Sequence, residues 1–170
     1  PAGPLAADGK AIFAACSACH GVGGEGNSKN GAPNIAGMEA WYSERQLSNF
    51  ASGVRGATTT DSFGAQMRAA VALLKSDAER AAVATYVAGL PPRKVAAAAK
   101  ADLANGSTQF NAICSSCHGS HGRGNKTLGA PNLIGLDPIY AERQILAFRS
   151  GTRGGHKDDK WGGQMRLVYR

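Results

Sequence analysis

Residues 16–20 read Cys-Ser-Ala-Cys-His, and residues 114–118 repeat the pattern as Cys-Ser-Ser-Cys-His. In this register residues 16–68 align with residues 114–166 without a gap, and 27 of the 53 aligned pairs are identical. A fixed internal period of this kind marks a duplicated structural unit. The sequence therefore predicts two tandem copies of one small domain, offset by 98 residues.

The repeated pattern C-x-x-C-H is the attachment signal for c-type haem. Its two thiols form thioether bonds to the haem, and the adjacent imidazole becomes an axial ligand of the iron. We therefore predict two covalently bound haem c groups. The predicted attachment residues are Cys16, Cys19, Cys114 and Cys117, and the predicted iron ligands beside them are His20 and His118.

Four cysteines have three other common uses in proteins. A single zinc site would leave two histidines over, and the 94 residues between the cysteine pairs are far more than in a zinc ribbon. A thioredoxin-type redox pair would need a strand–helix unit around it. Plain disulfides would close very tight loops. The doubled motif favours haem over all three.

One methionine recurs in both copies and is the predicted second axial ligand. Met67 and Met165 each lie 47 residues after the haem histidine, within Gln-Met-Arg. A thioether suits low-spin haem iron and raises its reduction potential. A lone methionine is more often a packing residue, but the recurrence favours ligation. Two filled axial positions leave no open site, which favours an electron carrier over an enzyme.

Other recurring residues are candidates for contacts around the haem. Pro33 and Pro131 lie 13 residues after the histidines, where a backbone carbonyl could accept a hydrogen bond from the imidazole; the alternative is that they only shape the turn. Recurring arginines could pair with haem propionates, although such side chains are more often solvated. These arginines are Arg45, Arg143, Arg55 and Arg153.

The sequence predicts an all-α fold. Helical patterns run into the cysteines at 5–15 and 103–113, glycine-rich loops follow at 21–37 and 119–135, and helices are expected at 39–51 and 138–149. The stretch Ser76-Asp-Ala-Glu79 is a capping box that opens a helix ending near Gly89. We expect a first domain at 1–92, an alanine-rich linker at 93–104 and a second domain at 105–170. The second copy stops five residues past Met165, so either the chain is clipped or disordered there or the second domain lacks its closing helix.

The chain has a formal net charge of +7, with +2 up to residue 98 and +5 beyond it. This excess would suit an acidic protein partner or an anionic membrane surface, so the protein is expected to be soluble or peripherally associated with a membrane. For a protein partner, the second copy, through Arg149 and Arg153, is the expected docking side. No basic run is interleaved with aromatic residues, which argues against nucleic acid. No stretch is apolar enough for a membrane span. A secretory signal is also missing, so we expect a processed terminus.

The two C-x-x-C-H motifs, the Ala-Pro-Asn loop and the recurring methionine resemble class I c-type cytochromes. Their tandem arrangement resembles the bacterial two-haem cytochrome c-four family. That resemblance implies two haem domains facing each other across a pseudo-twofold axis, a periplasmic location and electron delivery to a terminal oxidase. An electron-accepting subunit of a periplasmic dehydrogenase is the alternative, and a haem peroxidase with a displaceable ligand is a third.

Overall fold

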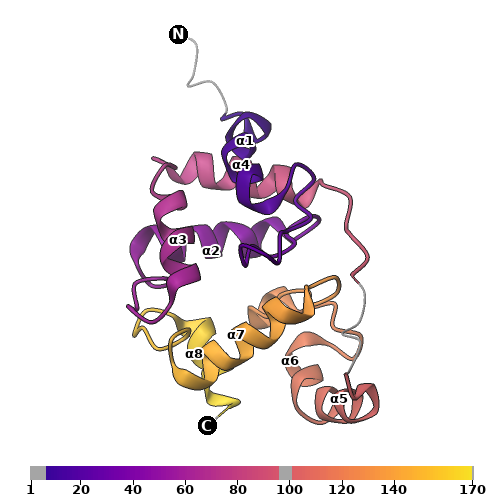
Figure 1. Cartoon of the computed structure of the whole chain (residues 1–170). Coiled ribbons are helices and arrows are strands. Elements are labelled where there is room, and N and C mark those ends of the chain that lie inside the picture. The colour runs from indigo at the N-terminus through magenta and orange to yellow at the C-terminus, as the bar shows by residue number, and fades with distance from the viewer. Residues whose placement is uncertain (1–6, 96–100, 170) are drawn as a thin grey trace.

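A computed structural model describes residues 7–95 and 101–169, which we call the first and second units. Within these residues the regular structure is helical, apart from two isolated bridges, Asn27–Ala32 and Asn125–Ala130. The two units stack on each other, with the first unit above the second in Figure 1. The all-α prediction is confirmed.

The two copies place their helices at matching positions. The helices of the first unit are α1 (Gly9–His20), α2 (Ala40–Ser52), α3 (Ser62–Val71) and α4 (Asp77–Ala88). Those of the second unit are α5 (Leu103–Gln109), the π-helical segment η1 (Phe110–Cys114), α6 (Ser115–His118), the short 3-10 helix η2 (Lys126–Leu128), α7 (Pro138–Ser150) and α8 (Lys160–Leu167).

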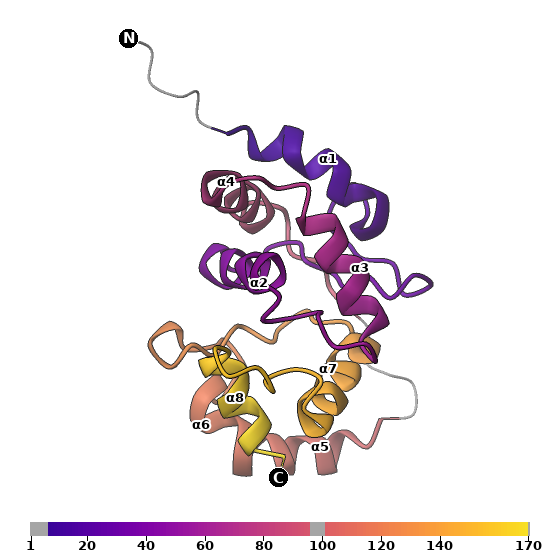
Figure 2. The ribbon, with the colours of Figure 1, turned by 90° about the vertical axis from the view of Figure 1, so that its left-hand side faces the viewer.

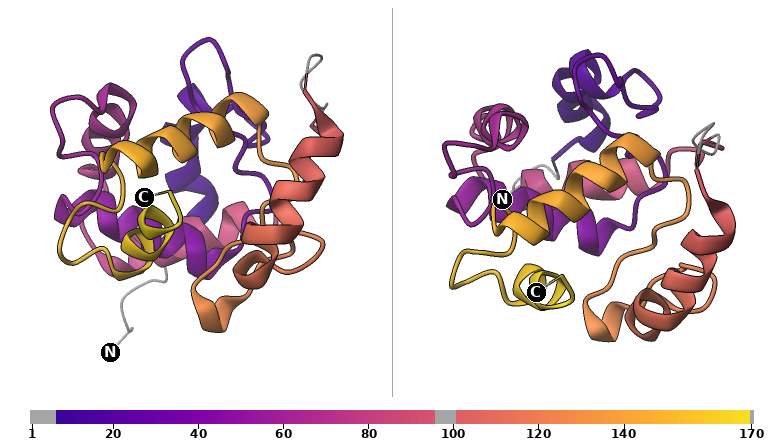
Figure 3. Two further views of the ribbon diagram at one scale, coloured as in Figure 1. Left: turned by 90° about the horizontal axis from the view of Figure 1, so that it is seen from below. Right: turned by 60° about the horizontal axis from the view of Figure 1, so that its bottom comes forward.

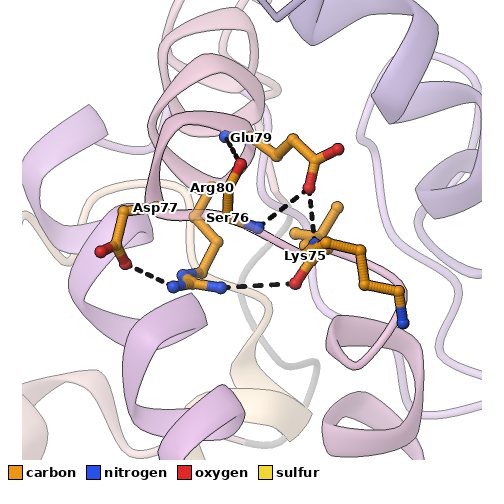
Figure 4. Close-up of polar contacts among 6 residues, drawn as sticks. Lys75, Ser76, Asp77, Glu79 and Arg80 are labelled. Carbon is orange, nitrogen blue, oxygen red and sulfur yellow. Dashed lines mark hydrogen bonds and ion pairs between the residues drawn. The ribbon is translucent and has the colours of Figure 1, made fainter.

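Side-chain caps fix where several of these helices begin. The Asp8 carboxylate accepts hydrogen bonds from the first backbone amides of α1, and the Asp137 carboxylate accepts one at the start of α7. The predicted capping box at the start of α4 is present, with Ser76 and Glu79 each accepting a backbone N–H of the other (Figure 4). Such caps satisfy amides that have no partner inside the helix.

The apolar core of the first unit lies where α4 packs against α1 and α2. Phe13 on α1 contacts Val83 and Val87 on α4, and all three are at most 5% exposed. Leu47 on α2 packs against the same cluster. Figure 2 shows α4 between α1 and α2. α4 therefore holds the helix that carries the cysteines against the rest of the unit.

The second unit is more open. The positions that would correspond to α4 lie beyond the sequence, and the described residues end at Tyr169. Ile145, the counterpart of the core residue Leu47, is 41% exposed. The α5–α6 segment lies to one side of α7 and α8 (Figure 3). Among the described residues, the helix that carries the haem motif of this unit has little packing behind it.

Several expected boundaries can be compared with the structure. The predicted helices at 39–51 and 138–149 are α2 and α7. Residues 96–100 of the expected linker and residue 5, where the first helix was expected to begin, lie outside the described residues. α5 begins at Leu103, inside the predicted linker. Of the described helices, none is long and apolar enough to cross a membrane.

Candidate haem sites

Each C-x-x-C-H motif ends the helix that carries it. In the first unit the motif forms the last turns of α1, which ends at His20. In the second unit Cys114 ends the π-helical segment and His118 ends α6. Both histidines are buried, at 6% and 4% exposed. The spacing therefore places two thiols and one imidazole on a single helix end in both units, as haem attachment requires.

The imidazole orientation is fixed in the same way in both units. Nδ1 of His20 lies 2.9 Å from the carbonyl oxygen of Pro33, and Nδ1 of His118 lies 2.9 Å from that of Pro131. A ring N–H that donates to a carbonyl leaves the other nitrogen, Nε2, free to bind a metal. Burial lowers the pKa of His20, which favours the neutral imidazole that iron needs.

The four thiols are chemically free for thioether bonds. None of the cysteines is in a disulfide. Cys16 and Cys114 are partly buried, and burial raises the pKa of both thiols. Cys19 and Cys117 are exposed. This donor set of two thiols and one neutral imidazole fits a covalently bound haem.

The predicted methionine ligands occupy equivalent helical positions. Met67 is the sixth residue of α3, and Met165 is the sixth residue of α8. Both side chains are partly exposed. Each of these helices is capped at its N-terminus by an aspartate, Asp61 or Asp159. Their binding to iron stays a prediction.

The four candidate propionate arginines all lie at the boundary between the units. Arg45 donates to the carbonyl oxygen of Gly129 at 2.7 Å, and Arg143 donates to that of Gly31 at 2.5 Å. Arg45 and Arg143 are equivalent positions of the repeat, and so are Gly31 and Gly129. Each unit therefore donates the same hydrogen bond to the other. A pair of like surfaces that contact each other in this reciprocal way has twofold symmetry.

A second reciprocal set lies beside the first. Arg55 donates to the Tyr140 hydroxyl at 3.2 Å and to the Gln144 side chain at 2.8 Å. Arg153 donates to the Tyr42 hydroxyl at 2.8 Å and to Gln46 at 3.1 Å. We call these eight residues the interdomain network: Tyr42, Arg45, Gln46, Arg55, Tyr140, Arg143, Gln144 and Arg153.

The network concentrates the positive charge of four arginines, and the buried carboxylate of Asp159 acts on Arg45 and Arg153 from nearby. Among the described residues, no ion pair involves any of its four arginines. Burial alone would raise the pKa of the Tyr140 hydroxyl, but Arg55 and Arg153 outweigh burial and the pKa lies below its usual value. Three donors here are buried without an acceptor: Nε of Arg45, Nε of Arg143 and Nε1 of Trp41. Carboxylates such as haem propionates would satisfy these donors.

The structure corrects one expectation about the surface. Arg153 was expected to help dock an acidic partner, but it is 8% exposed and its guanidinium bonds inside the interdomain network. Arg149, at the end of α7, is exposed as a docking residue must be. Sequence reasoning also assigned no role to the recurring Tyr42/Tyr140 and Gln46/Gln144 pairs, although their recurrence was a signal.

Known proteins share both the sequence and the fold. Residues 6–91 and 103–167 match the cytochrome c family model. A thiosulfate dehydrogenase electron acceptor of Stutzerimonas stutzeri (strain A1501) is 32% identical over 92% of this chain and 77% of that protein. Cytochrome c4 of Pseudomonas aeruginosa is 31% identical over 91% of this chain and 76% of that protein.

A solved structure extends the likeness to three dimensions. The crystal structure of reduced recombinant cytochrome c4 from Pseudomonas stutzeri superposes with a TM-score of 0.73 at 27% identity. The match covers 94% of this chain and 87% of that one. The chain therefore belongs to the cytochrome c family, as a two-haem electron-transfer protein of the type represented by cytochrome c4.

Proposed function

We propose that this protein carries electrons in the periplasm between a dehydrogenase and a respiratory acceptor such as a terminal oxidase. The observation that carries the proposal is the duplicated site, in which a buried histidine at a helix end is held by a proline carbonyl 13 residues later. Two equivalent sites in one chain suit a relay. They do not provide the differentiated acid and base groups of an enzyme.

Five residues with separate roles hold each haem. Cys16 and Cys19 hold the first haem covalently, His20 and Met67 bind its iron, and Pro33 orients the imidazole. The second site uses Cys114, Cys117, His118, Met165 and Pro131 in the same roles. The haem supplies the one-electron chemistry, and a thioether ligand raises its potential. The arginines of the interdomain network bind the propionates.

A dehydrogenase is the favoured source of the electrons. The support is the similarity to a protein named as the electron acceptor of thiosulfate dehydrogenase, which spans most of this chain. The chain would then accept electrons from a partner that oxidises a small inorganic substrate. Delivery to a terminal oxidase is the second half of the same path. Co-purification with a catalytic subunit would support the first half.

The first test is the visible spectrum of the oxidised and reduced protein, with haem quantified after denaturation. We expect two covalent haems per chain, a low-spin reduced spectrum and the weak long-wavelength band of methionine–iron ligation. The reduced protein is expected not to bind carbon monoxide. One haem per chain, a high-spin signal or carbon monoxide binding would contradict a carrier with two closed sites.

The second unit is the proposed docking side for an acidic partner. It carries five exposed basic residues at positions 123, 126, 149, 157 and 160. We expect Arg149→Glu with Lys160→Glu to slow reduction by anionic hexacyanoferrate at low salt and to have little effect at high salt, because salt screens exposed charges. The matched control is Lys10→Glu with Lys29→Glu on the first unit. Equal slowing by both pairs would contradict a docking side.

A further inference from the structure

The two halves of the interdomain network differ at one repeat-related position. Trp41 lies on α2 four residues before Arg45, and its counterpart on α7 is Ile139, four residues before Arg143. Residues four apart on a helix are neighbours on one face. An indole N–H can donate a hydrogen bond, whereas an isoleucine side chain cannot. The two arginines therefore have unequal neighbours.

Packing holds the Trp41 ring beside Arg45. The Arg45 guanidinium lies 4.9 Å from the Trp41 ring centre and 5.7 Å from that of Trp161. The edge of the indole also meets the ring of Tyr42, with ring centres 5.8 Å apart. By contrast, Ile139 is 62% exposed. The Arg143 guanidinium is stacked as well, 4.1 Å from the Phe63 ring centre and 5.4 Å from that of Tyr140. The surroundings of the two arginines therefore differ in the donor that Trp41 supplies and not in whether the guanidinium is stacked.

Two adjacent donors in the stack of Trp41 on Arg45 have no acceptor. Both Nε1 of Trp41 and Nε of Arg45 are buried and unpartnered. Around Arg143, the only described donor that is buried without a partner is its own Nε. Buried donors are rarely left without a partner. A bound acceptor would satisfy them, and an anion suits a site built around an arginine.

We propose that Trp41 donates a hydrogen bond to a propionate of one haem and raises the reduction potential of that haem alone. The proposal rests on the binding of propionates by the network arginines, as argued above. A carboxylate near the iron stabilises the ferric state. A donor that draws off part of that negative charge favours the ferrous state. Because Ile139 offers no such donor, Trp41 makes the two haems unequal.

The test is a spectroelectrochemical titration of the two-haem protein, resolved into two one-electron steps. Trp41→Phe is expected to lower one potential and leave the other unchanged. The expected change in the reduction equilibrium is up to about tenfold, or about 59 mV for one electron. The resonance Raman propionate bending mode of that haem should shift as well. Ile139→Phe, at the exposed counterpart position, is the matched control and should change neither.

The results of these experiments distinguish a failure of this inference from a failure of the proposed function. A shift of both potentials by the same amount in Trp41→Phe, or of neither, overturns the inference. If Trp41→Phe does not fold, Ile139→Trp decides, because the added donor should raise the other potential alone. If Arg45→Gln and Arg143→Gln also change neither the potentials nor the Raman mode, the propionate sites of the proposed function fail as well.

Discussion

The two units share their chemistry and differ in their packing. Both place a buried histidine 2.9 Å from a proline carbonyl, although among the described residues only the first unit has a packed core of buried residues behind it. In the first unit Phe13 packs on α4. Its counterpart in the second unit is Asn111, which is exposed. The histidine–proline geometry is therefore the same in both units, although the described packing behind it differs.

The helix that carries the motif also differs between the units. α1 is a regular helix of 12 residues. In the second unit the same stretch is interrupted by the π-helical turn Phe110–Cys114. π-helical turns are rare and usually occur as single-turn bulges within α-helices. This irregular turn lies in the unit whose described residues pack less behind the motif.

The largest expected effect tests this difference in packing. Phe13→Ala removes a buried aromatic ring and should lower the free energy of unfolding by about 3–5 kcal/mol. The equivalent change in the second unit, Asn111→Ala, should cost less than about 0.5 kcal/mol because the side chain is exposed. Urea unfolding followed by helical circular dichroism would measure both, with haem content checked first. Equal losses would show that the second unit also has a core at this helix.

A smaller effect tests the region where the units are alike. Arg153→Ala removes hydrogen bonds to Tyr42, Gln46 and Gln144 and should cost about 2–3 kcal/mol. Arg55→Ala removes the equivalent bonds and should cost a similar amount. The exposed Arg149 supplies the control, since Arg149→Ala should cost less than about 0.5 kcal/mol.

The same urea experiment can contradict the reciprocal network. If Arg55→Ala is neutral while Arg153→Ala is costly, the two sets of bonds are not equivalent in solution. If all three arginine variants behave alike, the network does not hold the units together. Either result would also weaken the argument that the network arginines bind propionates.

The sequence alone predicted the haem motifs and most helices because their signals are local. Cys16, Cys19 and His20 lie within five residues, and the Ser76–Glu79 capping box is equally short. The partners of the arginines could not be predicted in this way. Arg45 bonds to Gly129, which is 84 residues away in the sequence. Recurrence marked these residues as important, but only the structure shows that they bridge the units.

The methionine helices show a second limit of the sequence. α3 and α8 contain glycines such as Gly64 and Gly162, and their apolar residues are too few for a clear helical period. Their aspartate N-caps were the available signal. Trp41 shows a third limit, because it does not recur in the second copy. Recurrence between the two copies therefore does not mark it.

The smallest expected effect concerns the start of α4, the helix that distinguishes the first unit. The Ser76 hydroxyl accepts the Glu79 backbone N–H, and the Glu79 carboxylate accepts the Ser76 N–H (Figure 4). Ser76→Ala should cost about 1 kcal/mol in urea unfolding, because one amide of the first turn loses its partner. Ser62→Ala is the control, since Asp61 caps α3 and Ser62 is exposed. A neutral Ser76→Ala would mean that packing against α1 and α2 alone fixes α4, and the difference between the units would then depend on its apolar face.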